Sequence, residues 1–292
     1  AWTLQDTYEG STFFNGFDFF TSADPTHGFV QYVDQATAQS SGLIYNQGSQ
    51  VIIKADATST TPNGRPSVRI SSQATYNSGL FIFDLEHMPF GCATWPAIWL
   101  VGPNWPNGGE IDIIEGVNLQ TTDSMTLHTA SGCTMENVAR TETGTPTGHQ
   151  DCDVTNDPSN LGCGVTSTST TSYGQGFNNE NGGVYATRWT ASTGIQIWFF
   201  DRSSIPSDIQ SGSPNPDSWP TPAADFPFTS CNPSLFSNMK IVLDLTFCGD
   251  WAGSVYSSSG CPSDCTTYVS NTPSGFDEAY WRINSFKVYQ SS

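Results

Sequence analysis

Short apolar runs recur along the whole chain, and residues that favour turns separate them. Glycine, proline, asparagine and serine bound the runs, and neither a heptad repeat nor a long amphipathic helix pattern is present. Runs of this length, rich in β-branched and aromatic residues, are typical of β-strands. The clearest strands are predicted over Ser67–Thr75, Gly79–Leu85, Glu110–Glu115, Ser124–Thr129, Val184–Trp189, Ile195–Phe200, Met239–Phe247 and Tyr280–Tyr289.

The apolar runs are of two kinds, which indicates how the strands pack. Ile195-Gln196-Ile197-Trp198 alternates, as in a strand with one covered face. Residues 80–83 (Leu-Phe-Ile-Phe) are apolar throughout, as in a strand covered on both faces. Many short strands of both kinds predict an all-β fold, a jelly-roll sandwich of two antiparallel sheets.

Two long segments lack this pattern. Thr141–Asn181 is polar and rich in glycine, serine and threonine, and we expect a surface loop anchored by Cys152 and Cys163. Ser203–Pro227 is rich in proline and serine with little periodicity. Strand patterns stand on both sides of each segment, so neither is predicted to link two domains. We therefore expect residues 1–292 to form a single jelly-roll domain.

Charged residues are sparse and mostly acidic. Nine lysine and arginine residues stand against 27 aspartate and glutamate residues, so the formal net charge is −18. This charge repels phosphate backbones and anionic membranes, whereas uncharged sugars are unaffected by it. No run reaches the roughly 18 apolar residues of a membrane helix. We therefore expect no nucleic-acid partner, no membrane partner, and a soluble monomer.

Eight cysteines indicate a chain that matures in an oxidising compartment. No C-x-x-C pair and no close pair of histidines completes a zinc site, so structural disulfides are predicted, with their pairing left open. The chain begins at Ala1 without a charged-then-apolar leader, as a secreted protein does after signal removal, so secretion is expected. The candidate disulfide cysteines are Cys92, Cys133, Cys152, Cys163, Cys231, Cys248, Cys261 and Cys265.

One predicted strand, residues 110–115 (Glu-Ile-Asp-Ile-Ile-Glu), combines apolar residues with three acids. Glu110 and Asp112 share one face of a regular strand. Strict alternation would place Glu115 in the core, where an unpaired carboxylate is costly. A β-bulge at residues 113–114 would return Glu115 to the face of the other two acids. We therefore predict a bulged strand with three acids on one face and the isoleucines in the core.

Two carboxyl groups on one face suit glycoside hydrolysis. The Glu110 and Glu115 Cα atoms would be roughly 13 Å apart at ~3.3 Å per residue. Side chains that lean together could close most of that gap, toward the ~5–5.5 Å carboxyl separation of a retaining mechanism. Crowded like charges should raise at least one pKa, as a general acid requires. A solvated acidic strand edge and a calcium site are the alternatives, although calcium usually takes its ligands from a loop.

The sequence around these acids resembles glycoside hydrolase family 16. Residues 110–115 match the family's E-x-D-x-x-E signature, and four flanking blocks are similar to its fungal laminarinase branch. The similarity runs from about Asp24 to Val288. The blocks are residues 91–99 (Gly-Cys-Ala-Thr-Trp-Pro-Ala-Ile-Trp), 105–109 (Trp-Pro-Asn-Gly-Gly), 125–129 (Met-Thr-Leu-His-Thr) and 245–253 (Leu-Thr-Phe-Cys-Gly-Asp-Trp-Ala-Gly).

The resemblance implies a curved jelly roll with a sugar cleft on its concave face. It also implies retaining, endo-acting hydrolysis of β-1,3-glucans, often with activity on mixed 1,3/1,4 glucans. Carried over by position, Glu110 would be the nucleophile and Glu115 the acid that protonates the leaving oxygen and then activates water. Asp112 would assist between them.

Each predicted sugar contact has a packing alternative, because aromatic rings stack on sugars but also fill protein cores. Trp105 and Trp251 lie among loop residues, which favours sugar contact, whereas Trp99 lies inside an apolar run. A structural histidine, a turn asparagine and a surface ion pair are the alternatives for the three polar candidates. The predicted substrate-binding residues are Trp95, Trp99, Trp105, Asn118, His128, Trp251 and Arg69.

Two other functions of the same fold stay open. A non-catalytic β-glucan-binding protein would be expected to have lost one of the two glutamates. A cell-wall transglycosylase would pass the sugar to another glycan instead of water. No P-loop, dinucleotide fingerprint or H-E-x-x-H motif is present. We expect no cofactor and no metal, and a β-glucan polysaccharide or oligosaccharide as the partner.

Overall fold

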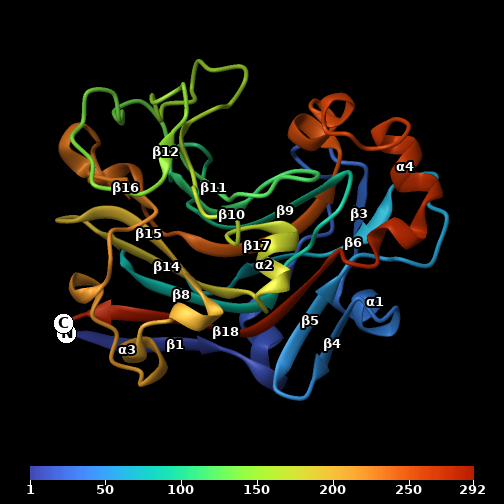
Figure 1. Ribbon diagram of the computed structural model, residues 1–292, viewed down its shortest axis with the longest axis horizontal. Coiled ribbons are helices and arrows are strands. Elements are labelled where there is room, and N and C mark those ends of the chain that lie inside the picture. The colour runs from blue at the N-terminus through green and yellow to red at the C-terminus, as the bar shows by residue number, and fades with distance from the viewer.

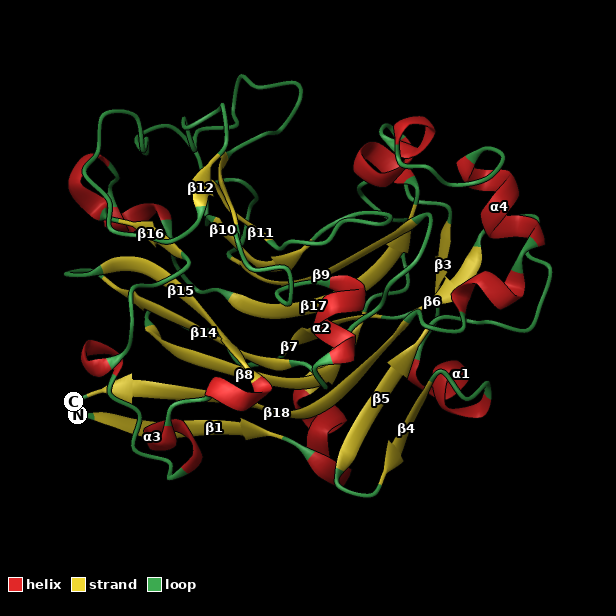
Figure 2. Cartoon of the chain, viewed as in Figure 1, coloured by secondary structure: helices red, strands yellow, loops and turns green.

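The computed structural model describes residues 1–292, and strands make up most of its regular structure (Figure 2). Two eight-stranded antiparallel sheets stack face to face (Figure 1). Sheet A runs in the order β16 (Ala224–Phe226), β15 (Gly194–Asp201), β14 (Gly183–Thr190), β8 (Gly79–His87), β18 (Tyr280–Ser291), β5 (Gln50–Lys54) and β4 (Ile44–Gln47), and β1 (Trp2–Tyr8) also pairs with β18.

Sheet B carries the acidic strand. Its order is β12 (Thr145–Pro146), β13 (Cys163–Thr166), β11 (Ser124–His128), β10 (Glu110–Glu115), β9 (Thr94–Val101), β17 (Lys240–Phe247), β7 (Arg69–Ser72) and β2 (Phe17–Phe19). A parallel pair, β3 (Val30–Tyr32) and β6 (Arg65–Ser67), stands apart from the two large sheets. The predicted all-β sandwich of two antiparallel sheets is confirmed.

The helices are short; three lie at the periphery of the sandwich, and one, Gly174–Asn179, lies over the strands in the middle of the view (Figure 2). They are α1 (Gln35–Ser40), α2 (Gly174–Asn179), α3 (Ser207–Gln210) and α4 (Cys265–Asn271). Helices α1 and α4 begin at aspartates, Asp34 and Asp264, whose side chains accept backbone N–H bonds three residues on. None of the helices has the length and apolar character that crossing a membrane requires.

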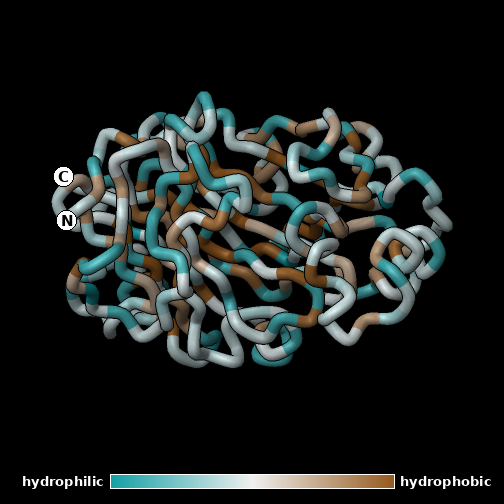
Figure 3. The backbone as a smooth tube through the Cα atoms, turned by 90° about the horizontal axis from the view of Figure 1, so that it is seen from above, coloured by the Kyte–Doolittle hydropathy of each residue, from teal (hydrophilic) through white to brown (hydrophobic).

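The main core lies between the two sheets and contains 44 buried residues. Phe81 and Phe83 of β8 face into this core, while Leu80 and Ile82 face outward into a second cluster that includes Trp198. The prediction that β8 is covered on both faces is therefore confirmed. Figure 3 shows the same arrangement as hydrophobic strand segments inside a more hydrophilic periphery.

The alternating strand β15 differs from its prediction. Ile195 and Ile197 face the main core, but Gln196 and Trp198 on the opposite face are also buried. Trp219, from the segment Ser203–Pro227, packs edge-on against Trp198 and covers this face. An intervening segment without periodicity thus shields a face that the pattern left exposed.

The prediction of one polar surface loop over Thr141–Asn181 is wrong for much of the segment. It contains β12, β13 and α2, and its aromatic residues Tyr173 and Phe177 lie fully buried in the main core. Cys152 and Cys163, the two cysteines expected to anchor the segment, are bonded to each other. Few apolar residues are spaced through this stretch, which explains why its strands and helix left no periodic signal.

Candidate active site

The predicted β-bulge is present in β10 and sets the geometry of the site. Against β9, Asp112 pairs with Trp99, but the next pair is Ile114 with Ile98, so the register shifts by one residue between them. Ile113 and Ile114 are both fully buried. Only an extra residue allows two successive side chains to enter the core while the following Glu115 returns to the opposite face. The three acids therefore line the outer face of sheet B.

Glu110 lies in a cluster of polar partners. One carboxylate oxygen accepts a 2.8 Å hydrogen bond from the indole N–H of Trp105. The other lies 3.1 Å from Nδ1 of His128, and a carboxylate oxygen of Asp112 lies at the same distance from that nitrogen. Glu110 and His128 are direct partners in the β10–β11 register, which explains why residues 18 positions apart meet here.

His128 is held as an imidazolium. Its Nε2 donates to the backbone carbonyl of Asn160 at 3.1 Å, while Nδ1 faces the two acids. Burial opposes the charge, but Glu110 and Asp112 outweigh it and raise the pKa of His128 well above its usual value. The side chain is nearly buried, so it cannot serve as an open sugar-binding surface in this structure.

The imidazolium fixes the ionisation of Glu110. Burial alone would raise the pKa of Glu110, but the charge and hydrogen bond of His128 outweigh it, and Asp112 and Trp105 add further hydrogen bonds. Together they lower the pKa to about 2. Burial, reinforced by the charges of Glu110 and Glu115, raises the pKa of Asp112 well above its usual value. Glu110 therefore ionises far more readily than the carboxyl group beside it.

Glu115 has a different environment at the other end of the strand. Its carboxylate accepts a 2.8 Å hydrogen bond from the indole N–H of Trp95. Burial raises the pKa of Glu115 to about 7, although the Trp95 bond opposes the shift. A carboxyl group with such a pKa can hold a proton near neutrality and release it, as an acid and base must.

Aromatic side chains lie beside both glutamates. Trp105 is 46% exposed, although its N–H is bonded to Glu110. Trp95 packs edge-on against Trp251, with ring centroids 5.9 Å apart, and Trp251 stands on a π-helical turn at Gly249–Gly253. The exposed ring of Trp105 therefore lies at the Glu110 end of β10. The half-buried rings of Trp95 and Trp251 lie at the Glu115 end.

A fourth acid on this face, Asp244 of β17, was missed by the sequence analysis. It accepts a 2.9 Å hydrogen bond from the indole N–H of Trp99. Burial raises the pKa of Asp244 to about 7, against the opposing charge of Arg69. The available signal was a lone acid inside the apolar run of residues 241–247 (Ile-Val-Leu-Asp-Leu-Thr-Phe).

One group of donors in the site could also hold a metal ion. The ligating atoms of Glu110, Asp112 and His128 lie within 4.8 Å of one another. A metal would need the lone pair of Nδ1, and the raised pKa of His128 keeps that nitrogen protonated. Metal binding at this group would therefore have to displace a proton that the neighbouring carboxyl groups stabilise on His128.

Comparison with known proteins identifies the family. Residues 17–289 match the model of an XgeA-like catalytic domain of glycoside hydrolase family 16. The chain belongs to glycoside hydrolase family 16. This finding confirms the resemblance that the acidic strand and its flanking blocks indicated, and it makes the chain a glycoside hydrolase.

Relatives and solved structures agree with the assignment. The chain is 53% identical over 293 residues to a probable glycosidase of Schizosaccharomyces pombe, covering 99% of this chain and 70% of the relative. It is 44% identical over 303 residues to a probable endo-1,3(4)-β-glucanase of Aspergillus fumigatus, covering 99% of this chain but 46% of the relative. The chain thus spans less than half the length of that fungal relative.

Two solved structures superpose closely. Laminarinase 16A of Phanerochaete chrysosporium, with β-glucans in both donor and acceptor sites, has a TM-score of 0.94 and 49% identity over 99% of each chain. An elongating family 16 β-1,3-glucosyltransferase has a TM-score of 0.93 and 43% identity, covering 99% of this chain and all of the other. The fold is therefore the family 16 jelly roll.

The structure brings the predicted family 16 site residues to one face of sheet B, except for Asn118. Asn118 is buried, its amide oxygen accepts from the N–H of Ala93 at 2.8 Å, and its amide nitrogen donates to the carbonyl of Ala252 at 3.1 Å. The predicted bond from Asn118 to a sugar hydroxyl does not fit this geometry. The side chain instead ties the start of β9 to the turn that carries Trp251.

Arg69 stands on the same face but not as the alternative surface ion pair. Its guanidinium lies over the rings of Phe20 and Trp99, 4.6 and 5.2 Å from their centroids. Trp99 thus contacts Arg69 through its ring face and Asp244 through its indole N–H.

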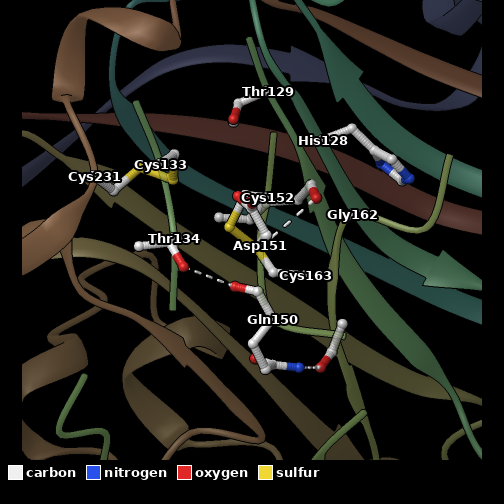
Figure 4. Close-up of a disulfide and its surroundings, with 12 residues drawn as sticks. His128, Thr129, Cys133, Thr134, Gln150, Asp151, Cys152, Gly162, Cys163 and Cys231 are labelled. Carbon is white, nitrogen blue, oxygen red and sulfur yellow. Dashed lines mark hydrogen bonds between the residues drawn. A yellow bond between two sulfur atoms is a disulfide. The ribbon is translucent and has the colours of Figure 1, made fainter. Parts of the chain in front are cut away.

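Four disulfides brace the loops around the site. The pairs are Cys92–Cys261, Cys133–Cys231, Cys152–Cys163 and Cys248–Cys265, which use all eight predicted cysteines. Cys152–Cys163 closes a loop beside His128, and Cys133–Cys231 lies near it (Figure 4). That loop supplies the Asn160 carbonyl to which His128 donates, so the disulfide restrains the partner of the imidazolium.

Proposed function

We propose that the domain hydrolyses β-1,3-glucans, and mixed-linkage β-1,3/1,4-glucans, by an endo-acting retaining mechanism with Glu110 as nucleophile and Glu115 as acid and base. The observation that carries the proposal is the difference between the two carboxyl groups. They share one strand and one face, yet one is ionised with a pKa of about 2 and the other has a pKa of about 7. Two carboxyls with separated pKa values are what a double-displacement glycosidase requires.

In the first step the two glutamates act together. Glu115 transfers its proton to the glycosidic oxygen, while a carboxylate oxygen of Glu110 attacks the anomeric carbon. The bond between that carbon and the leaving oxygen breaks, and a glycosyl ester of Glu110 forms. The His128 imidazolium and the hydrogen bond from Asp112 keep Glu110 ionised and oriented before the attack.

In the second step the roles of Glu115 reverse. Its carboxylate removes a proton from water, and the water oxygen attacks the anomeric carbon while the Glu110 ester bond breaks. Two inversions at one carbon retain its configuration. Glu115 recovers its proton, and Glu110 returns to its ion pair with His128.

Aromatic rings on the face would hold the glucan on either side of the reacting bond. Trp105 is exposed beside the nucleophile, and Trp95 and Trp251 stand beside the acid. Trp99 is half-buried between them under the fixed contacts of Arg69 and Asp244. The relatives and structures named for β-glucans support a glucan as the substrate.

The test is a product analysis. The parent chain, Glu110→Ser and Glu115→Gln are incubated with laminarin and with barley mixed-linkage glucan, and reducing ends, product sizes and the anomeric form of new ends are followed. Short oligosaccharides with β-configured new ends are expected from the parent, and losses of orders of magnitude from both variants. If the parent binds either glucan but cuts neither, the proposal of an enzyme is wrong and the chain is a glucan-binding protein.

Transglycosylation is the second candidate, because the chain is 43% identical to an elongating β-1,3-glucosyltransferase. Its first step would be the same, and a sugar hydroxyl would replace water in the second. Incubation with laminari-oligosaccharides separates the two. Hydrolysis yields only shorter products, whereas transfer yields products longer than the substrate.

We also propose that the domain works outside the cell. Four disulfides in a chain of this size are typical of proteins that mature in an oxidising compartment. Detection of the natural protein in the culture medium, with intact disulfides, tests this.

A further inference from the structure

A buried acid lies behind Glu115, at a place where the sheet is interrupted. The β10–β11 ladder runs from Glu110 to Asp112 and stops at the bulge, whereas the ladder with β9 continues to Glu115. Beyond the bulge, the backbone N–H of Glu115 therefore has no partner on β11. A buried backbone N–H without a partner costs free energy, so the fold must supply an acceptor.

Asp123 supplies that acceptor. Its Oδ1 accepts the N–H of Glu115 at 2.9 Å, and the residue has no exposed surface. Its own backbone is fixed on both sides, since its N–H donates to Oγ of Ser172 at 3.0 Å and its carbonyl accepts from Ser167 at 2.9 Å. A side-chain oxygen thus replaces the missing strand bond at the residue that carries the proposed acid.

The other oxygen of this carboxyl group indicates that Asp123 is neutral. Oδ2 is buried and accepts no hydrogen bond, because the nearby Tyr185 hydroxyl, which would favour the ionised form, donates to the carbonyl of Ser172 instead; such a position would be very costly for an anion. Burial raises the pKa of Asp123 well above its usual value. A protonated aspartate and an asparagine would be almost equivalent here, because both offer Oδ1 as an acceptor.

Packing makes the position rigid. Gly116, directly after Glu115, lies so close to Tyr173 that a side-chain carbon there would meet the ring at 2.5 Å. The hydroxyl of Tyr185 donates to the carbonyl of Ser172, next to the hydroxyl that holds Asp123. The segment behind the bulge therefore cannot shift without disturbing the core.

We propose that Asp123 is a positioning residue for the acid and base Glu115: through Oδ1 it fixes the bulged end of β10 and so aims the Glu115 carboxyl group at the leaving oxygen. This inference rests on the proposed function. Asp123 never touches the substrate, because it is fully buried. Its removal should therefore impair protonation of the leaving group more than any other step.

The charged and titratable groups around the pair come from several elements. Glu115 is influenced by Glu110, His128 and Asp244 on the outer face, and Asp123 by Tyr185 and by Glu115 itself. Asp123→Asn changes none of these charges if Asp123 is neutral. It is therefore the matched control for Asp123→Ala, which removes the acceptor.

The experiment compares two substrates that differ in their need for an acid. A laminari-oligosaccharide has a poor leaving group that must be protonated, whereas the 2,4-dinitrophenyl glycoside of laminaribiose has one that leaves without help. For Asp123→Ala, kcat/KM on the oligosaccharide should fall about 100-fold, as misplacement of a reacting group by about 1 Å can cause. On the aryl glycoside it should fall less than about threefold, and Asp123→Asn should match the parent on both.

Other outcomes are equally informative. Equal losses on both substrates would assign Asp123 a general structural role and overturn the inference while leaving the proposed function intact. A parent that cleaves neither substrate would overturn the proposed function and this inference with it. If Asp123→Ala does not fold, Asp123→Thr replaces it, because its hydroxyl is one bond too short to reach the Glu115 N–H and its volume is similar. The same selective loss is expected from it.

Discussion

The two ends of β10 place the same residue type in opposite electrostatic surroundings. At the first end, Glu110 lies where β10 is paired with strands on both sides, and His128 of β11 stands directly opposite it. At the second end, Glu115 lies beyond the bulge, paired with β9 alone, with no cation in contact. Only the first end therefore has a neighbour strand that can bring a positive charge to the acid.

This difference shows how a single strand can hold two carboxyl groups with well-separated pKa values. Both glutamates are partly buried, and both accept an indole N–H, from Trp105 and Trp95. These shared features cannot separate their pKa values. The separation comes from the imidazolium in contact at one end, and at the other from burial that the Trp95 hydrogen bond and the more distant His128 charge do not outweigh. The β-bulge is what keeps both on one face while giving them different neighbours.

The largest expected effect comes from removing each glutamate in turn. Glu110→Ala should lower kcat on laminarin by roughly 10⁴-fold or more, as loss of a nucleophile does. Glu115→Ala should lower it by roughly 10²–10⁴-fold on laminarin, the contribution of a general acid and base. With an aryl glycoside whose leaving group needs no protonation, the first step should stay fast in Glu115→Ala but not in Glu110→Ala.

Azide separates the two roles by stereochemistry. With an activated β-aryl glycoside, azide should intercept the glycosyl-enzyme of Glu115→Ala and give a β-glycosyl azide, after two inversions. In Glu110→Ala it should replace the nucleophile and give the α-azide, after one. Nuclear magnetic resonance of the products decides, and the opposite pairing of variants and anomers would reverse the assignment of the two ends.

The next largest effect is expected from removing the cation at the first end. In His128→Gln the pKa of Glu110 should rise from about 2 by one to three pKa units, because the adjacent charge is lost. The acid limb of the kcat/KM profile should move upward by the same amount, so activity falls at pH 4 far more than at pH 6. An unchanged acid limb would show that His128 does not hold Glu110 ionised.

The same variant makes a stability prediction whose sign follows from the direction of the shift. A carboxyl with a lowered pKa in the folded state adds stability above its unfolded pKa, and this stability is lost as the pH falls through the folded value. His128→Gln should therefore reduce the free energy of unfolding at pH 6, and the difference from the parent should shrink toward pH 2. Denaturant unfolding at several pH values measures it.

The sequence allowed the acids and their shared face to be predicted, because the argument was local. The pair Ile113–Ile114 and the costly burial of Glu115 together required a bulge, and the bulge is present. The partners of the acids depend on contacts distant in sequence. His128 meets Glu110 only through the β10–β11 register, and Asp123 meets Glu115 only because that register ends at the bulge.

Other omissions also have physical causes. Strand β9 was not predicted, since Pro96 interrupts its pattern. In the structure Pro96 lies next to Ala97, whose pairing with Glu115 is the last between β9 and β10, so the missing N–H of the proline interrupts no bond to β10. The buried role of Asn118 depends on two backbone partners from separate segments. Local pattern therefore predicts the proposed reacting groups, whereas the residues that tune and hold them emerge from tertiary structure.

A smaller effect is expected from the disulfide beside the first end. Removing Cys152–Cys163 by a double alanine substitution should cost about 3 kcal/mol of unfolding free energy, as for a short closed loop. It should also loosen the Asn160 carbonyl that holds His128 and move the acid limb slightly upward. Removing Cys248–Cys265, which closes a similarly short loop near Trp251, is the matched control and should leave the acid limb in place.

The smallest effects should come from the two indoles, and they test whether the ends of β10 are independent. Trp95→Phe removes a donor that favours ionised Glu115, so the pKa of Glu115 should rise from about 7 by about one unit and the basic limb of kcat/KM should move upward.

Trp105→Phe should instead raise the pKa of Glu110 and move only the acid limb. The shift should be smaller, because water reaches the exposed Trp105 and can replace its hydrogen bond. Profiles on one soluble oligosaccharide, with samples re-assayed at pH 5 to exclude unfolding, measure both limbs. If either substitution moves both limbs together, the two carboxyl groups titrate as one unit, and the separate environments of the strand ends do not set their roles.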